Sequence, residues 1–248
     1  MTTYCFHDLV PQVAARLGIA ALLVGSSLVS DARAQAPTAP VLTGNALYRM
    51  TLLRAAPGRF PDLLADVRKH VSGSGGLAVR HSQGDQWDFL LLVPVPPAAS
   101  GGGIPASLLT SPFSDAAVAW QEDEFVRGPS LEAIPGFLAA GLYHFEMFDA
   151  APGKLDELVH EREMENAYLA GVGRPRNLIF RREFGAAWDA FTIGAYRDWR
   201  HYAERDLVTP DKARAAAKAA GFESDQTVGP YMRSLILSHH DTLATPIR

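Results

Sequence analysis

The chain has very little cysteine. Its 248 residues include one, Cys5, so the residues after position 36 offer no disulfide, no zinc–thiolate site and no thiolate nucleophile. An excess of basic charge is also missing, because 23 Lys and Arg stand against 27 Asp and Glu and the formal net charge is -4. Nucleic-acid-binding domains usually carry a clustered basic face, so this composition argues against a nucleic-acid partner.

Long apolar runs and familiar catalytic motifs are absent as well. The run "LGIAALLVGSSLV" over residues 17–29 is shorter than the roughly 20 residues that span a bilayer. Arg16 precedes it and "AQA" at 34–36 follows, a pattern typical of a secretory signal peptide. We predict a signal peptide over 1–36, an exported (periplasmic or secreted) mature chain and no stable membrane insertion after cleavage; a packed N-terminal helix is the alternative. No P-loop, G-x-G-x-x-G, G-x-S-x-G or H-E-x-x-H occurs.

A repeated phrase is the main positive feature. "LYRMTLLRAAPGRF" begins at Leu47, and "LYHFEMFDAAPGKL" begins at Leu142, 95 positions later. In each copy a run of β-forming residues leads to the turn "AAPG", and apolar residues at helical spacing follow over 59–71 and 154–169. Two predicted hairpins then lie over 77–93 and 177–193, and each holds a Trp-Asp pair. The repetition predicts two similar structural units.

Each half therefore reads β-α-β-β-α, and the second adds a last strand over 231–240. Further helices are expected over 114–126, 196–205 and 211–220, and no fourth strand is evident in the first half. A β-α-β-β-α-β unit is ferredoxin-like, with helices on one face of its antiparallel sheet. We predict an α+β fold: after a linker over 37–45, two tandem ferredoxin-like repeats, 46–140 and 141–248, press sheet to sheet as a pseudo-dimeric α/β barrel. Two separate sandwiches that dimerise with another chain are the alternative, and either arrangement is compatible with a homo-oligomer.

This pattern resembles the dimeric α/β-barrel superfamily, which includes antibiotic-biosynthesis-monooxygenase-like and NIPSNAP-like proteins. The resemblance is carried by the strand–"PG"–helix openings over 47–67 and 142–159 and by the two Trp hairpins, and it covers most of 46–240. It implies the fold but no single reaction, because the superfamily includes cofactor-free monooxygenases, haem enzymes, isomerases and proteins without a known reaction. No catalytic residue of one family can be transferred to this sequence.

Alternation along the opening strands sorts their side chains into two faces. The bulky set is assigned to the helix-packed side: Tyr48, Met50, Leu52, Tyr143, Phe145 and Met147. The polar set, Arg49, Thr51, His144 and Glu146, is assigned to the barrel interior. There His144 would accept a proton or bind a ligand, Glu146 would assist it, and Arg49 would hold an anionic group, with Thr51 beside it. An internal Arg49–Glu146 salt bridge, or reversed faces, are the alternatives.

Other residues are weaker candidates. Trp87 and Trp188 recur at equivalent positions and are either core anchors or the walls of an apolar ligand pocket. A metal face made of His240, His144 and Glu146 is less favoured than a polar strand end, and no metal site is predicted. Glu157 and His160 have the spacing of a di-iron motif but are expected on a solvated face. The Pro/Gly-rich loop over 94–105 has the length of a lid.

Three functional hypotheses follow. The leading one is an exported protein that binds a small, partly apolar molecule in the barrel. The second is a monooxygenase- or isomerase-like enzyme that uses His144 and Glu146, with haem or a metal as an assisting cofactor of unknown identity. The third is a structural partner protein without a cavity.

Overall fold

The structure is a computed structural model that describes residues 42–96, 109–185 and 187–248. The predicted signal peptide, most of the linker and most of the proposed lid lie outside the described residues. Residues 39–248 form one compact unit. No helix in the described part of the chain is long and apolar enough to cross a membrane.

The described residues form eight strands, which are connected by helices or turns. The strands are β1 (Ala46–Ala55), β2 (Leu77–Gln83), β3 (Phe89–Pro94), β4 (Val118–Gly128), β5 (Leu142–Ala150), β6 (Asn177–Gly185), β7 (Ala190–Tyr196) and β8 (Ile236–Pro246). The α-helices are α1 (Phe60–Val71), α2 (Leu155–Val172), α3 (Trp199–Ala203), α4 (Pro210–Ala219) and α5 (Val228–Arg233), with 3-10 turns at Phe137–Ala139, Glu204–Leu207 and Asp225–Thr227. The mixture is α+β, as the sequence predicts.

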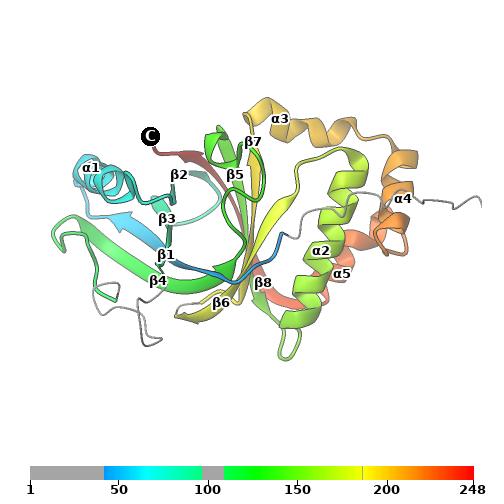
Figure 1. Ribbon diagram of the computed structural model, residues 1–248, viewed down its shortest axis with the longest axis horizontal. Helices are drawn as coiled ribbons and strands as arrows, with labels where there is room; N and C mark the ends of the chain where they lie inside the picture. Colours follow the sequence, from blue (N-terminus) through cyan, green and yellow to red (C-terminus); the bar gives the residue numbers. More distant parts are fainter. Residues whose placement is uncertain (1–41, 97–108, 186) are drawn as a thin grey trace, which may run out of the picture. The chain divides into compact units, whose positions relative to one another are not determined.

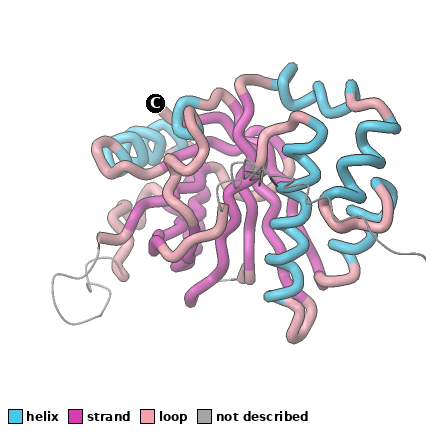
Figure 2. Tube along the Cα trace, turned by 45° about the vertical axis from the view of Figure 1, so that its right-hand side comes forward, coloured by secondary structure: helices cyan, strands magenta, loops and turns pink. Residues whose placement is uncertain are grey.

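The strands pair in the closed order β1-β3-β2-β8-β5-β7-β6-β4, and every pair is antiparallel. Each half of the chain supplies four neighbouring strands in the same internal order, β4-β1-β3-β2 and β8-β5-β7-β6. The halves meet where β2 pairs with β8 and where β4 pairs with β6. Figure 1 shows α1 on one side of this ring and α2, α4 and α5 on the opposite side, and Figure 2 shows the strands between the two groups of helices.

The repeated phrases have the same structural roles in both halves. Gly58 and Gly153 adopt φ values of 77° and 75°, a left-handed conformation that favours glycine and turns each chain from strand into helix. The repeated aspartates then fix the ends of the central strands. Asp88 Oδ2 accepts a hydrogen bond from the amide of Ala55 at 2.8 Å, and Asp189 Oδ2 accepts one from Ala150 at 2.9 Å.

Three sequence-based assignments of secondary structure are wrong. Residues 114–126 were expected to be helical, but β4 occupies most of that range and is the fourth strand of the first half. It pairs with β1 along nearly its whole length and with β6, so cross-strand pairing overrides the local helical pattern. The last strand begins at Ile236, after α5, and not at 231. Residues 196–198 belong to β7 or to the turn before α3.

The two faces of the opening strands are also the reverse of the predicted ones. Tyr48, Met50 and Leu52 from β1 share one buried cluster with Tyr143, Phe145 and Met147 from β5. This cluster joins both halves and fills the interior of the ring. A separate cluster, which includes Leu53, Leu63 and Val67, lies between β1 and α1. The bulky side chains therefore face the interior of the ring, where they are removed from water in the large apolar cluster.

Candidate functional site

The polar side chains of β1 and β5 face the helices, and they lie in different surroundings in the two halves. Arg49 and Thr51 lie beneath the helix of the first half, whereas His144 and Glu146 lie beneath that of the second. The predicted convergence of Arg49, His144 and Glu146 inside the ring is therefore wrong. Arg49 forms its ion pair with Asp123 and not with Glu146.

The first-half site is fully paired. Arg49 Nε donates to Asp123 Oδ1 at 2.9 Å, and Arg49 NH1 donates to the carbonyl of Thr110 at 2.9 Å. Thr51 Oγ1 donates to the same carboxylate at 2.6 Å, and Gln121 Nε2 donates to its other oxygen, also at 2.6 Å. Burial would raise the pKa of Asp123, but these donors outweigh it and lower the pKa. The adjoining cavity has a volume of about 110 Å³.

The second-half site adjoins a larger cleft of about 410 Å³. The cleft lies between α2 and the outer faces of β5, β6 and β7, with residues after α3 at its rim. Its polar walls include His144, Glu146, Glu165 and Asn177, and its aromatic walls are Tyr168, Tyr196 and Tyr202. A volume of this size is typical of small-molecule sites. We call it the α2 cleft.

His144 is paired with a carboxylate from the neighbouring strand. Its Nε2 lies 3.4 Å from Asp241 Oδ1 on β8, and its ring lies 5.5 Å from that of Tyr202. Burial alone would lower the pKa of His144, but nearby carboxylates, first among them that of Asp241, raise it above its ordinary value. Asp241 in turn has a lowered pKa, chiefly because of His144. The pair therefore holds a proton on His144 more firmly than an isolated imidazole would.

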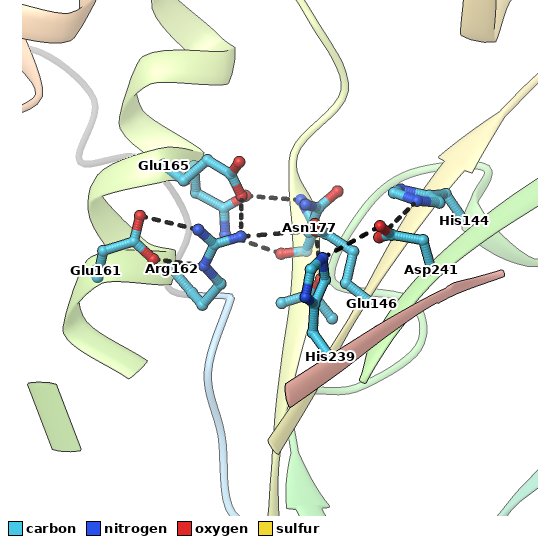
Figure 3. A network of polar contacts seen from close by, with 10 residues as sticks. His144, Glu146, Glu161, Arg162, Glu165, Asn177, His239 and Asp241 are labelled. Carbon is cyan, nitrogen blue, oxygen red and sulfur yellow. Dashed lines mark hydrogen bonds and ion pairs between the residues drawn. The ribbon is translucent and has the colours of Figure 1, made fainter. Parts of the chain in front are cut away.

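A buried charge network forms the base of the cleft (Figure 3). Arg162 on α2 is 2% exposed and makes a two-pronged contact with Glu161, at 2.6 and 2.8 Å. Its NH1 also donates to Glu165 at 2.9 Å and lies 3.6 Å from Glu146. Three carboxylates therefore share one guanidinium.

The excess of acid over base decides where protons reside. Burial raises the pKa of Glu165 to about 7, and the like charges of Glu146 and Glu161 act in the same direction. The Arg162 guanidinium opposes them but does not cancel them. Glu165 is thus a carboxyl group that is partly protonated at neutral pH and can donate a hydrogen bond or a proton within the cleft.

Asn177 adds an acceptor without a partner. Its backbone amide donates to Asn166 Oδ1 at 2.7 Å, and Asn166 Nδ2 donates back to its carbonyl at 2.9 Å, so α2 and β6 are tied together. Within the described residues, the buried Asn177 Oδ1 accepts no hydrogen bond. Buried polar atoms are rarely left in this state. A hydroxyl or amine of a ligand in the α2 cleft could satisfy it.

The other sequence candidates lie away from the cleft. Trp87 is buried inside the ring, where it donates to Asp85 Oδ2 at 3.0 Å. Trp188 packs against the interior cluster and against the ring of His240. His240 approaches Asp85 at 3.4 Å and so does not join His144 and Glu146.

The di-iron spacing is not part of any such site either. Glu157 pairs with Lys154 at 2.6 Å, and the exposed His160 lies near Glu163. In the described ranges, no group of three or more His, Cys, Asp or Glu side chains is placed to hold a metal ion. Nor does the donor set of the cleft fit haem, because His144 Nε2 already faces Asp241 and the walls carry two carboxylates.

Sequence reasoning missed Glu161, Arg162, Glu165, Asn177, His239 and Asp241. One signal was available. Leu158 begins a buried stripe on α2, and the next positions at helical spacing are the buried Glu161 and Arg162 and the partly buried Glu165. A helix whose buried stripe changes from apolar to charged predicts a polar surface on the strands beneath it.

Comparisons with known proteins support the fold class. No family model matches the chain, and no curated protein matches it. Among solved structures, an anthrone oxidase-like protein superposes with a TM-score of 0.59 at 14% identity, covering 84% of this chain and 93% of its own. A candidate monooxygenase from Lactobacillus acidophilus gives 0.49 at 9% identity, covering 82% and 95%. A haem-binding protein from Thermus thermophilus gives 0.40 at 8%, covering 82% and 92%.

The chain therefore has an α+β fold with a closed, eight-stranded antiparallel sheet, and it shares this fold with the anthrone oxidase-like protein. At these identities the likeness concerns the fold alone. Any activity of this chain has to be argued from its own site.

Proposed function

We propose that the protein is an acid–base enzyme that binds a small, partly aromatic ketone in the α2 cleft and catalyses its keto–enol tautomerisation. The observation that carries the proposal is the His144–Asp241 pair on the wall of a cleft of about 410 Å³. This differs from the leading sequence hypothesis, which placed the ligand inside the ring. It retains His144 and Glu146 in the site.

The proton steps balance within the side chains of the cleft. An imidazole that directs Nε2–H toward Asp241 keeps its lone pair on Nδ1, and this nitrogen removes a proton from the carbon beside the ketone carbonyl. Glu165, protonated at the start, gives its proton to the carbonyl oxygen as the enol forms. Asp241 stabilises the imidazolium, as the carboxylate of a catalytic triad does. When the enol leaves, the imidazolium gives its proton to water and Glu165 takes one up from water, which restores both residues. Return of the enol to the ketone uses the same transfers in the opposite direction.

The remaining walls suit an aromatic, uncharged molecule. Tyr168, Tyr196 and Tyr202 offer ring surfaces for packing, and Asn177 Oδ1 can accept from a phenolic hydroxyl. Glu146 and Glu165 disfavour anionic ligands, and Arg174, which also lines the cleft, donates to the carbonyls of His201 and Tyr202. The likeness to an anthrone oxidase-like protein is one of fold, and it makes an anthrone, an enolisable aromatic ketone, a reasonable first probe.

The test is deuterium uptake at the acidic carbon of an anthrone in D2O, followed by proton NMR under nitrogen. We expect the wild-type protein to accelerate uptake and His144→Ala to lose at least about 100-fold of that acceleration. His160→Ala, which removes an exposed histidine of α2, is the matched control and should keep the wild-type rate. Equal rates for wild type and His144→Ala would overturn the proposal.

The pH dependence is a second test. The base requires His144 neutral, which is favoured above its raised pKa, and the acid requires Glu165 protonated, which is favoured below about 7. The rate should therefore pass through a narrow maximum near neutral pH. Glu165→Gln should lower the maximum and remove the decline on the alkaline side.

We also propose that residues 1–36 direct export, and that the two halves arose as fused ferredoxin-like repeats. The first proposal rests on the basic–apolar–small pattern of the sequence, and the second on the repeated phrases and on the shared strand order. N-terminal sequencing of the protein recovered from a bacterial periplasm tests export. An N-terminus at Pro37 is the expected result, and retention of the full chain in the cytosol is the opposite one.

A further inference from the structure

Asp241 contacts a second histidine besides His144. His239 Nε2 lies 3.3 Å from Asp241 Oδ2, while His144 Nε2 lies 3.4 Å from Oδ1. The carboxylate is therefore held between two imidazoles, one on β5 and one on its own strand (Figure 3). The His239 ring is itself placed by stacking on Phe148, with an interplanar angle of 13°.

The first half has the same arrangement with different side chains. Asp123 faces Thr51 across the β1–β4 pair as Asp241 faces Glu146 across β5–β8, so the two aspartates are equivalent. Two residues before Asp123 stands Gln121, which donates to Oδ2 at 2.6 Å. Two residues before Asp241 stands His239. In both halves, the residue at this position contacts Oδ2 of the aspartate. The other oxygen, Oδ1, is contacted by Arg49 in the first half and by His144 in the second.

We propose that His239 is a positioning residue for the catalytic pair: by holding Asp241 Oδ2 it presents Oδ1 to His144. The inference rests on the proposed role of His144. Asp241 needs such support more than Asp123 does, because its side chain is 53% exposed, whereas that of Asp123 is 29% exposed and has three side-chain donors. Without an anchor, an exposed carboxylate would sample other rotamers and its field at His144 would weaken.

The charged groups near His144 and Asp241 also influence the titration of His144, which is the quantity to be measured. His144 also faces Glu146 and Glu165, and Asp241 also senses Arg233. Removing His239 would change both the anchor and any charge it carries, and these two effects move the His144 titration in opposite directions. A pair of variants separates them. His239→Gln and His239→Ala both remove the imidazole, but only glutamine keeps a donor for Oδ2, as Gln121 does in the first half.

The experiment is an NMR titration of His144 in the full-length protein without any ligand. We expect its pKa to be higher in His239→Gln than in His239→Ala by about 0.5 unit, a roughly threefold difference in proton affinity. Gln121→Ala, the same change in the first half, should leave the His144 titration at its wild-type position. Equal pKa values in the two His239 variants would overturn the inference.

A measurement on the wild type covers the case in which His239→Ala does not fold. If His239 holds Asp241, its Nε2 proton should exchange with water at least about tenfold more slowly than that of the exposed His160. Similar exchange at the two histidines would contradict the proposal. Neither measurement involves a ketone, so a failure here is distinguishable from a failure of the proposed tautomerase activity.

Discussion

The two halves of the ring place a cation beside an aspartate at the same point, but with opposite consequences. In the first half the cation is Arg49, which stays charged at all ordinary pH values, and Asp123 is fully hydrogen-bonded. In the second half it is His144, which titrates, and its carboxylate partner is more exposed. The same backbone arrangement thus holds a permanent ion pair, Arg49–Asp123, and an ion pair that depends on pH, His144–Asp241.

The helices above these pairs differ in the same sense. With the offset of 95 that relates the repeated phrases, Val67 of α1 corresponds to Arg162 of α2, and His70 corresponds to Glu165. Val67 belongs to an apolar cluster, whereas Arg162 is surrounded by carboxylates. The first half thus resembles a structural support, and the second concentrates the titratable groups.

The largest effect is expected at Arg162. Arg162→Met should lower the free energy of unfolding at pH 7 by about 3–5 kcal/mol, because Glu161, Glu165 and Glu146 would lose their shared buried partner. Urea unfolding measures the change. Arg181→Met is the matched control: its ion pair with Asp156 is solvent-exposed, and it should cost no more than about 1 kcal/mol. Equal losses would mean that the buried network is not what distinguishes α2 from α1.

Substitutions of the two equivalent aspartates should affect different properties. At Asp123 the main effect should be on the stability of the protein, and at Asp241 on the proton affinity of His144. Asp123→Asn weakens three charge-assisted hydrogen bonds and leaves Arg49 buried without its carboxylate, so it should cost about 2–3 kcal/mol. Asp241→Asn changes a carboxylate that is 53% exposed and should cost less than about 1 kcal/mol, yet it should lower the pKa of His144. Chemical denaturation and a histidine NMR titration measure the two outcomes. A large loss of stability in Asp241→Asn would remove the contrast between the halves.

The acid linkage of Asp123 has a defined sign. Its pKa is lowered in the folded protein, so the stability it contributes is present above its unfolded pKa and is lost as the pH falls through the folded value. Asp123→Asn should therefore reduce the difference in stability between pH 7 and pH 3.

Inside the ring, the halves differ at a second equivalent position. Glu124 of β4 faces Met50, as Thr242 of β8 faces Phe145, and in the described structure neither carboxylate oxygen of Glu124 accepts a hydrogen bond. Burial raises the pKa of Glu124 to about 9. Its folded pKa exceeds its unfolded one, so its contribution is most favourable below the unfolded pKa and declines as the pH rises through about 9.

Glu124→Leu should accordingly stabilise the protein at pH 8 by about 1–3 kcal/mol, because it removes a buried group without partners. It should also flatten the decline in stability between pH 5 and pH 9. Thermal unfolding across this range measures both effects. Thr242→Val, the corresponding change in the second half, should shift stability without altering its pH dependence.

The sequence predicted the strand–turn–helix openings of both halves well and the site only in part. The repeated "PG" turns and Trp-Asp pairs can be recognised from the sequence because each has a local cause. The turn needs a glycine in the left-handed conformation, and the aspartate accepts a hydrogen bond from the end of a strand. The alternation of side chains along β1 and β5 predicted which residues share a face. It did not predict which face lies inside the ring, because that depends on which side chains the helices bury. Asp241 and His239 lie about 95 residues from His144 along the chain, and only strand pairing brings them together.

Gly194 leaves room for the Asn177 side chain beside the α2 cleft. It lies on β7 opposite both His144 and Asn177, and a Cβ placed there would lie 2.7 Å from Asn177 Oδ1. With the hairpin offset of 101, the first half has Val93 at this position, on the wall of the smaller cavity. The smaller cavity, of about 110 Å³, is also bounded by Thr110 and Pro112, whereas the α2 cleft has a volume of about 410 Å³.

A small change in the free energy of unfolding, about 1 kcal/mol, is expected for Gly194→Ala, because the Asn177 amide can turn aside. Its effect on the cleft should be larger than on the fold. The displaced amide would occupy ligand space, so the affinity for an anthrone, measured by fluorescence or calorimetry, should fall about tenfold, or about 1.4 kcal/mol. Val93→Ala enlarges the equivalent cavity of the first half and should leave that affinity unchanged. If Val93→Ala weakened binding as much as Gly194→Ala, the ligand would have to contact both halves, and the division into a supporting half and a reactive half would be wrong.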